Sequence, residues 1–413
     1  MSGVVRWKVY LDWLISRYAE KKVKNEVKHL LWVSMYQVSF MKKADYHVVN
    51  EAVEFAKRVH GPTVANFVNA LLRRLVSEQH VLSHRPLPEL PPTRYSSTSS
   101  STQNSELKIQ NLSIAYSFPQ WLVRRWLKRF GRDETVRLLT LLNTPPEFCI
   151  RVNSDRIFIE EVISRLEQKG IAVRRGKYLD TALYVDKLGQ VLKDDLFTRG
   201  LIRVQDEASQ LAGSAIGPKV DGTILDACAG LGTKTGQLAG QQRGSRIIAM
   251  DKEMKRLKLV PDGIDLVKGD AVFSPFRDAV FDAILLDAPC SSLGIIRKHP
   301  EIKWRRQERE IARFGEYQLR LLESLWRTLK PGAHMVYSVC SFEPEETVSV
   351  IERFRKEEAF ILENPLPFLF NKAELSSLPA QTKLIPLGYK EYFLSLPHDT
   401  AMDGFFIARL KKI

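Results

Sequence analysis

The sequence contains only four cysteines in 413 residues, at positions 149, 228, 290 and 340. They lie far apart and form no Cys-x-x-Cys pair, so the pattern excludes a disulfide framework and a structural zinc site. We therefore expect four free thiols and no bound metal. Each cysteine then needs its own explanation, either packing in a core or chemistry at a site.

Long apolar runs are also missing. Charged residues, among them Arg6, Lys8, Asp12 and Arg17, interrupt the N-terminal region, and no uninterrupted run approaches the ~20 apolar residues of a spanning helix. We expect no membrane partner and a cytoplasmic location. Acidic residues are fewer than basic ones, 48 against 62, which gives a formal net charge of +14. Such an excess is typical of proteins that bind nucleic acids.

Composition and periodicity divide the chain into four segments. Residues 83–105 include a run of Pro, Ser and Thr and should form a flexible linker. Before it, residues 1–82 show helical periodicity and predict a helical domain. Residues 106–202 combine a basic amphipathic helix with short strands, which predicts a small α+β module. In residues 203–413 short apolar strands alternate with helices, the pattern of a parallel, doubly wound sheet.

Polar residues cluster at the ends of the predicted strands. Asp226, Asp251, Asp270 and Asp287 each end one, and Cys340 lies just past another. In an open parallel sheet these ends share one edge, where ligands bind. One such aspartate would be explained as a helix cap, but capping does not readily explain four acids and a thiol. The strands we predict are 223–227, 246–251, 265–270, 281–287, 334–338 and 404–410.

The turn after the first of these strands is rich in glycine. Gly230 and Gly232 would let the backbone approach a ligand closely, and the spacing is not that of a P-loop. Asp251 follows Gly232 by 251 − 232 = 19 residues, near the ~20 expected for a carboxylate that binds ribose hydroxyls. The loop predicts a nucleotide-containing cofactor and, taken alone, leaves a nicotinamide cofactor open.

Asp287, Cys290 and Cys340 together suit methylation of carbon 5 of a cytosine. That carbon becomes nucleophilic only after a thiolate adds to carbon 6 of the ring. The C5 proton and the thiol then leave, which a second thiol can assist, and a carboxylic acid can hydrogen-bond the ring edge. The alternative for each cysteine is packing in a core, which is common for free cysteines.

At these residues the sequence resembles the RsmB (Fmu/Sun) family of S-adenosylmethionine-dependent RNA cytosine-C5 methyltransferases, over most of the chain. The family's usual threonine before the second cysteine is Val339 here, and its usual glycine after the Cys-Ser pair is Ser292. The N-terminal segment 49–75 resembles a NusB-like RNA-binding domain. The other matching segments are 203-RVQDEASQL-211, 226-DACAGLGTKT-235, 287-DAPCSSLGIIRKHPEIKW-304, 337-YSVCSFEPEE-346 and 403-DGFFIARL-410.

The resemblance implies a fold and a set of roles. The fold is multidomain: an all-α NusB-like N-terminal domain, a small α+β, RRM-like middle module and an α/β Rossmann-like class I methyltransferase domain. Cys340 would be the nucleophile, Cys290 would assist product release, and Asp287 would hold the target cytosine. S-adenosylmethionine would be bound by Cys228, Ala229, Gly230, Leu231, Gly232, Thr233, Lys234, Asp251, Asp270 and Asp287.

The implied substrate is one cytosine of 16S ribosomal RNA, modified by a monomer. The alternatives are the same chemistry on tRNA or another RNA, a non-catalytic RNA-binding assembly factor, and a nicotinamide-dependent oxidoreductase, which does not explain the two late cysteines. A basic run after Cys290 offers candidate phosphate contacts, whose alternative is a solvated charged face. These are Arg297, Lys298, Lys303, Arg305 and Arg306.

Overall fold

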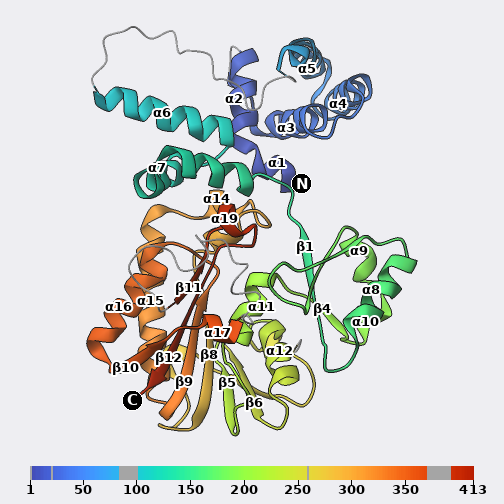
Figure 1. Ribbon diagram of the computed structural model, residues 1–413. Coiled ribbons are helices and arrows are strands. Elements are labelled where there is room, and N and C mark those ends of the chain that lie inside the picture. Colours follow the sequence, from blue (N-terminus) through green and yellow to red (C-terminus); the bar gives the residue numbers. More distant parts are fainter. Residues whose placement is uncertain (1, 20–21, 83–100, 258–259, 370–391) are drawn as a thin grey trace. The chain divides into compact units, whose positions relative to one another are not determined.

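The computed structural model describes residues 2–19, 22–82, 101–257, 260–369 and 392–413 (Figure 1). Of the predicted linker, residues 83–105, the part from 83 to 100 lies outside these residues. No helix among the described residues has the length and apolar character needed to cross a membrane.

The chain forms two compact units. Unit 1 comprises Met1–Thr144 and His299–Arg305, and unit 2 comprises Pro145–Lys298 and Arg306–Ile413.

Unit 1 is helical, as predicted for the N-terminal domain. Leu11, Leu31 and Val68 are among the side chains buried in its core. Gly61, with a φ of 87°, lies between α4 and α5, where Pro62 occupies the first helical position without losing a hydrogen bond. The helices are α1 (Ser2–Arg6), α2 (Lys8–Tyr18), α3 (Asn25–Ser39), α4 (Asp45–His60), α5 (Pro62–Leu82), α6 (Ser101–Tyr116), α7 (Gln120–Leu142) and α14 (Ile302–Arg305).

Lys303 is fully buried in unit 1, so its prediction as a phosphate contact is wrong. Its Nζ donates to Asn143 Oδ1 at 2.9 Å and to the Ser117 carbonyl at 3.1 Å, and it lies 3.5 Å from the centroid of the Phe118 ring. Burial lowers the pKa of Lys303 well below its usual value. This lysine joins α14 to the ends of α6 and α7 and faces no solvent.

The first part of unit 2 is a small α+β module, the class of fold predicted for the middle of the chain. Residues 106–144, which the predicted module 106–202 also included, belong to unit 1. Among the described residues its sheet has four antiparallel strands in the order β2-β3-β1-β4. Ile150 and Leu183 of this sheet pack against Val162 and Leu166 of α8. Its elements are β1 (Phe148–Val152), α8 (Ile159–Gln168), β2 (Val173–Arg175), β3 (Ala182–Val185), α9 (Leu188–Val191), α10 (Asp195–Thr198) and β4 (Ile202–Val204).

The second part of unit 2 is the predicted doubly wound sheet. Its described strands follow the order β10-β12-β9-β8-β5-β6-β7, with β11 also paired to β12. Strands β5 to β9 run parallel, and β12 is antiparallel to β9. The strands are β5 (Thr223–Asp226), β6 (Arg246–Asp251), β7 (Asp265–Lys268), β8 (Phe281–Asp287), β9 (Leu329–Val339), β10 (Phe360–Glu363), β11 (Tyr392–Ser395) and β12 (Phe405–Lys412).

Helices cover both faces of this sheet, with α11 and α12 on one side and α15 and α16 on the other (Figure 1). Val336 of β9 packs in the core formed with α11 and α12, whereas the hydroxyl of the next residue, Tyr337, donates to Gln318 of α15. This alternation follows the pleat of a strand buried on both faces. The remaining helices of unit 2 are α11 (Glu207–Ser214), α12 (Thr233–Gln241), α13 (Met254–Leu257), η1 (Ala271–Phe273), η2 (Leu293–Ile295), α15 (Glu308–Trp326), η3 (Pro344–Glu346), α16 (Val348–Glu357), α17 (Leu366–Leu369) and α19 (Pro397–Thr400).

Candidate active site

The strand order reverses between β5 and β8, which pair side by side in the large sheet. Ligands of open α/β sheets bind at the carboxyl ends of the strands at such a point. A cavity of about 290 Å³ lies there. Several residues predicted from the sequence line it together: Cys228, Gly230, Asp251, Asp287, Cys290 and Cys340.

Cys290 and Cys340 lie next to each other although 50 residues separate them in the sequence. Each follows one of two paired strands, β8 and β9, and their Sγ atoms are 3.2 Å apart as free thiols. The hydrogen bond between them is the main influence on both groups: it lowers the pKa of Cys340 and raises that of Cys290. The arrangement therefore favours a thiolate at Cys340 and a thiol at Cys290.

Ser292 approaches the same sulfur pair. Its backbone has a φ of 64°, a conformation that glycine adopts more readily than other residues. Its Oγ lies 3.6 Å from Cys340 Sγ and 3.9 Å from Cys290 Sγ. The departure from the family's glycine thus adds a hydroxyl within reach of Cys340.

Glu346 holds the two cysteine loops together. It is fully buried, and its carboxylate accepts hydrogen bonds from the Ser291 backbone N–H at 2.6 Å and from the Ser341 hydroxyl at 2.6 Å. Ser291 and Ser341 directly follow Cys290 and Cys340. Burial raises the pKa of Glu346, which the hydrogen bonds oppose. This glutamate lies in the matching segment 337–346, but the sequence analysis predicted no role for it.

Asp287 is paired with a buried cation. Its carboxylate accepts from Lys234 Nζ at 2.6 Å and from the Ser338 hydroxyl at 2.8 Å. Burial alone would lower the pKa of Lys234, but the charge of Asp287 and the hydrogen bond between them raise it. Lys234 was predicted to bind the cofactor; the structure places it against Asp287 and outside the lining of the cavity.

Asp226, at the end of β5, is nearly completely buried and lacks a cationic partner among the described residues. Its Oδ2 accepts from the Thr235 hydroxyl at 2.7 Å, while its Oδ1 has no hydrogen-bond partner in the part of the chain that the structure describes. Burial raises its pKa to about 7. Two neighbouring strand ends thus carry carboxyl groups in different environments.

The predicted cofactor loop is shared between two cavities. Asp251 Oδ2 accepts from the backbone N–H of Gly230 at 3.0 Å, which holds the loop against the end of β6. Cys228 and Gly230 line the cavity beside the cysteines, but Leu231, Gly232 and Thr233 line a second one, and Ala229 lines neither.

Asp270 also lies beside the first cavity and not in its lining. Its side chain caps η1 through the Val272 N–H at 3.0 Å and pairs with Lys252 Nζ at 3.0 Å. Lys252 does line the cavity, together with Tyr317 of α15. Sequence reasoning missed both. Lys252 could have been found as the neighbour of Asp251, but no pattern in the sequence singles out Tyr317.

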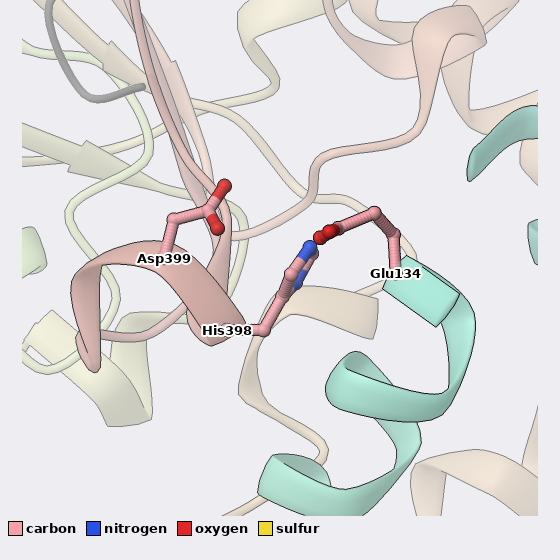
Figure 2. Close-up of side chains that lie close together, drawn as sticks. All are labelled: Glu134, His398 and Asp399. Carbon is pink, nitrogen blue, oxygen red and sulfur yellow. The ribbon is translucent and has the colours of Figure 1, made fainter. Parts of the chain in front are cut away.

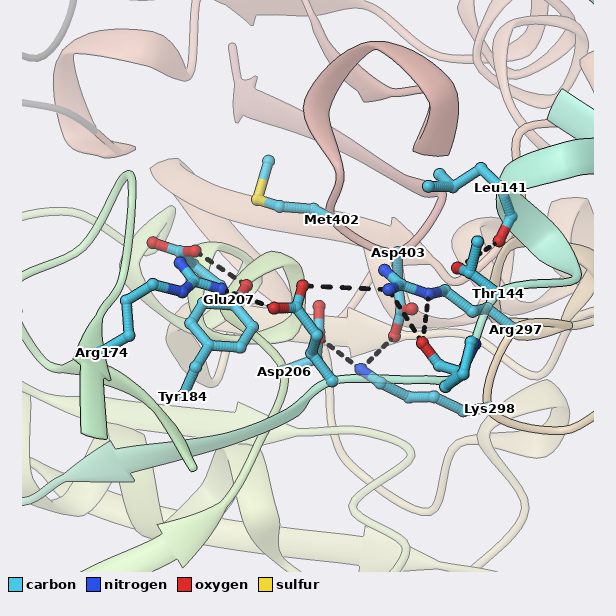
Figure 3. A network of polar contacts seen from close by, with 12 residues as sticks. Leu141, Thr144, Arg174, Tyr184, Asp206, Glu207, Arg297, Lys298, Met402 and Asp403 are labelled. Atoms are coloured by element: carbon cyan, nitrogen blue, oxygen red, sulfur yellow. Dashed lines mark hydrogen bonds and ion pairs between the residues drawn. The ribbon is translucent and has the colours of Figure 1, made fainter. Parts of the chain in front are cut away.

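Lys298, another candidate phosphate contact, points between two carboxylates (Figure 3). Its Nζ binds Asp206 and lies 2.8 Å from Asp403, so its charge is neutralised within unit 2. Arg306 donates to the carbonyl of Ser291 at 2.9 Å, beside the cysteine loop.

Figure 2 draws Glu134 of α7 together with His398 and Asp399 of α19, side chains of types that can bind metals. Glu134 belongs to unit 1 and the other two belong to unit 2. The three therefore do not make up a site of either unit, and the expectation of no metal stays a prediction.

The fold and the position of the cavity define a Rossmann-like methyltransferase domain. The family model for 16S rRNA methyltransferase RsmB/F matches residues 214–411, the RsmF/B ferredoxin-like domain matches 118–192, and the NusB family matches 1–77. Together with the relatives below, these matches show that the chain belongs to the RsmB/F family of 16S rRNA methyltransferases, as the sequence motifs predicted.

Two curated bacterial relatives are similar over nearly the whole chain. The probable ribosomal RNA small subunit methyltransferase B of Bacillus subtilis is 30% identical, over 99% of this chain and 88% of the relative. The corresponding methyltransferase B of Vibrio cholerae is 32% identical, over 95% and 82%.

Solved structures agree on the fold. The crystal structure of PH0851 has a TM-score of 0.77 and 26% identity, covering 100% of this chain and 88% of that one. A methyltransferase homologue from Pyrococcus horikoshii has a TM-score of 0.60 and 25% identity, covering 75% and 99%.

Proposed function

We propose that this protein methylates carbon 5 of a cytosine in small-subunit ribosomal RNA, with S-adenosylmethionine as methyl donor. The observation that carries the proposal is the pair of thiols 3.2 Å apart in the lining of one cavity with Asp287 and Asp251. The names of the relatives from B. subtilis and V. cholerae support ribosomal RNA as the substrate. The alternative of a nicotinamide-dependent oxidoreductase rests only on the glycine-rich loop and does not explain the two cysteines at the sheet edge.

The two cysteines would divide the reaction between them. The Cys340 thiolate adds to carbon 6 of the cytosine, forming a carbon–sulfur bond and making carbon 5 nucleophilic. After carbon 5 has taken the methyl group, its proton passes to solvent water, the C5–C6 double bond forms again, and the carbon–sulfur bond breaks, returning its electron pair to Cys340 as a thiolate. Cys290, hydrogen-bonded to Cys340, assists this release. Asp287, which also lines the cavity, would hydrogen-bond the edge of the base.

The cavity fits S-adenosylmethionine in its chemistry. When bound, this cofactor supplies the electrophilic methyl group. Asp251, at the end of β6, offers carboxylate oxygens to ribose hydroxyls, and the backbone near Gly230 can approach a ligand because no side chain intervenes. Apolar contacts come from Ala227 and Ala271 in the same lining. The volume of about 290 Å³ is near the lower end of the range for small-molecule sites.

The test uses the wild-type protein with small-subunit ribosomal RNA and S-adenosylmethionine, followed by digestion of the RNA and measurement of 5-methylcytosine. A parallel reaction with tRNA separates the two substrate classes. We expect 5-methylcytosine in the ribosomal RNA alone. The absence of turnover on either RNA would favour a non-catalytic RNA-binding assembly factor.

The roles of the cysteines are tested on a denaturing gel. The Cys290→Ala variant should accumulate protein covalently joined to RNA, and this adduct should vanish when Cys340 is also changed to Ala. Cys149→Ala is the matched control, because Cys149 is a buried thiol of the small module. If Cys290→Ala forms no adduct while the wild type makes 5-methylcytosine, the proposed division of labour is wrong.

A further inference from the structure

A second cavity of unit 2, of about 220 Å³, lies on the other side of the glycine-rich loop. Gly230 lines the cavity of the candidate active site, and the next two residues, Leu231 and Gly232, line the second one. Residues of this one loop therefore line both cavities. The opposite side is formed by the small module, through Arg151 and Arg203 among others.

Arg151 of β1 lies in this cavity in an unusual state. It is only 5% exposed, and its Nη2 makes no hydrogen bond to any residue that the structure describes. Its Nε donates to Gln205 Oε1 at 2.8 Å, and Gln205 in turn donates to Gln237 Oε1 at 2.8 Å. Burial lowers the pKa of Arg151 to about 10, since leaving water disfavours the charged guanidinium. The side chain is thus fixed in position with one donor unused.

The surroundings of Arg151 favour an anion. Arg156 and Arg203 add two positive charges to the lining, and the single carboxylate there, Asp155, lies 2.9 Å from Arg243 Nη2. The lining also contains Thr233, the first residue of α12. Amide groups in the first turn of a helix have no acceptor within the helix and attract negative charge.

Asn153 supplies a further unsatisfied atom. Its Nδ2 donates to the Gly200 carbonyl, but its buried Oδ1 has no partner among the described residues. This oxygen requires a donor beside the anion, which an ionised backbone phosphodiester does not itself offer. A ribose 2′-hydroxyl can donate to it. A nucleotide of RNA brings both the anion for Arg151 and the hydroxyl for Asn153.

We propose that this second cavity binds a backbone phosphate and the adjoining ribose of the RNA substrate. The inference rests on the proposed function, because it takes RNA as the substrate. Since consecutive residues of one loop, Gly230 and Leu231, line the two cavities, the phosphate would belong to a nucleotide near the one held at Cys340. The small module would thereby fix the register of the RNA strand at the active site.

The test measures binding of a short fluorescein-labelled single-stranded RNA at several salt concentrations, without S-adenosylmethionine. Losing one phosphate contact should reduce the slope of log affinity against log salt by about 0.7, and the affinity about fivefold at about 0.1 M salt. We expect this for Arg156→Ala, an exposed position, and for Arg151→Met. Arg156→Lys should retain the slope. Arg175→Ala is the control, because Arg175 is an exposed arginine of the same module outside the cavity lining.

Three outcomes are distinguishable. If Arg156→Ala and Arg151→Met both keep the wild-type slope, the proposal is overturned. It is equally overturned if calorimetry finds inorganic phosphate binding that Arg151→Met abolishes while the RNA slope does not change, because the site would then take a free anion. A changed slope supports it. Synthesis of 5-methylcytosine by the wild type is read separately, so failure of the proposed chemistry would leave this binding result standing.

Discussion

The contact between Cys290 and Cys340 makes a quantitative prediction about thiol acidity. Replacing Cys290 by Ala removes the sulfur that lies 3.2 Å from Cys340 Sγ and is the main cause of the lowered pKa of Cys340. A thiol is a weak donor, so we take the bond to a thiolate as about 1 kcal/mol, below the usual range for charged groups. At about 1.36 kcal/mol per unit, the pKa of Cys340 should rise by about 0.7.

This shift is measured by the rate at which iodoacetamide alkylates Cys340 as the pH is raised, with the modified peptide quantified by mass spectrometry. Only the thiolate reacts, so the midpoint of the rate profile reports the pKa. Below that midpoint the variant should react about fivefold more slowly than the wild type at the same pH. Neither RNA nor cofactor is needed, which keeps this measurement independent of the proposed reaction.

Cys149→Ala serves as the control, because Cys149 is buried beneath Gln210 in another part of unit 2. It should leave the midpoint of Cys340 unchanged. A midpoint in Cys290→Ala equal to or below that of the wild type would refute the reasoning. The acidity of Cys340 would then have to come from Ser292 and Lys234, the other two groups that lower its pKa.

Three further predictions concern the groups behind the thiols. Lys234→Met leaves the part-buried Asp287 unpaired, so urea denaturation should show a loss of about 3 kcal/mol of unfolding free energy; an unchanged value would contradict the assigned pairing. Glu346→Gln replaces a charged acceptor of two serines and should lower kcat about tenfold or more, with little change in the KM for RNA; an equal loss in KM would argue against a positioning role. Burial raises the pKa of Asp226 to about 7, above its usual value near 4 in an unfolded chain. The stability that this proton contributes is therefore complete below about pH 4 and is lost as the pH rises through about 7. When the pH is raised from about 5 to about 8, the unfolding free energy of the wild type should therefore fall by about 2–3 kcal/mol more than that of Asp226→Asn. Identical pH profiles of the two proteins would rule out a buried carboxyl group that titrates in this range.

The strands of the large sheet could be predicted because their signal is local. Each is a short apolar run that ends in a polar residue, as at Asp226 and Asp287, and the parallel arrangement follows from the alternation with helices. The prediction that these ends and Cys340 meet at one edge needs only this topology. Fold class and the main members of the site were therefore accessible from the sequence.

The burial and the partners of individual charged residues could not be predicted from the sequence in the same way. Lys303 lies in a basic run and looks like a phosphate contact, but the groups that surround its ammonium come from residues distant in sequence, among them Ser117 and Asn143. Arg151 has no distinguishing local pattern either. Its Nε is bound by Gln205, which directly follows β4, the strand paired with β1 in the small sheet. Whether a charged side chain is buried or exposed depends on contacts with residues distant in sequence that pair with or hydrogen-bond its charge. Local patterns in a single sequence do not show these contacts.

The two carboxyl groups at the switch point show how an acid and a thiolate can share one cavity. Alone, Asp287 would raise the pKa of Cys340 and hinder ionisation of this thiol, whereas Lys234 lowers the pKa. Because Lys234 lies 2.6 Å from Asp287, the two charges oppose each other at Cys340. The hydrogen bond with Cys290 is the largest influence and outweighs burial, so the pKa of Cys340 is lowered. Asp226 forms no ion pair with any residue that the structure describes, and burial raises its pKa to about 7, although the charge of Lys234 acts in the opposite direction. Asp287 and a Cys340 thiolate can thus line one cavity, because Lys234 pairs with Asp287 and burial favours the protonated form of Asp226.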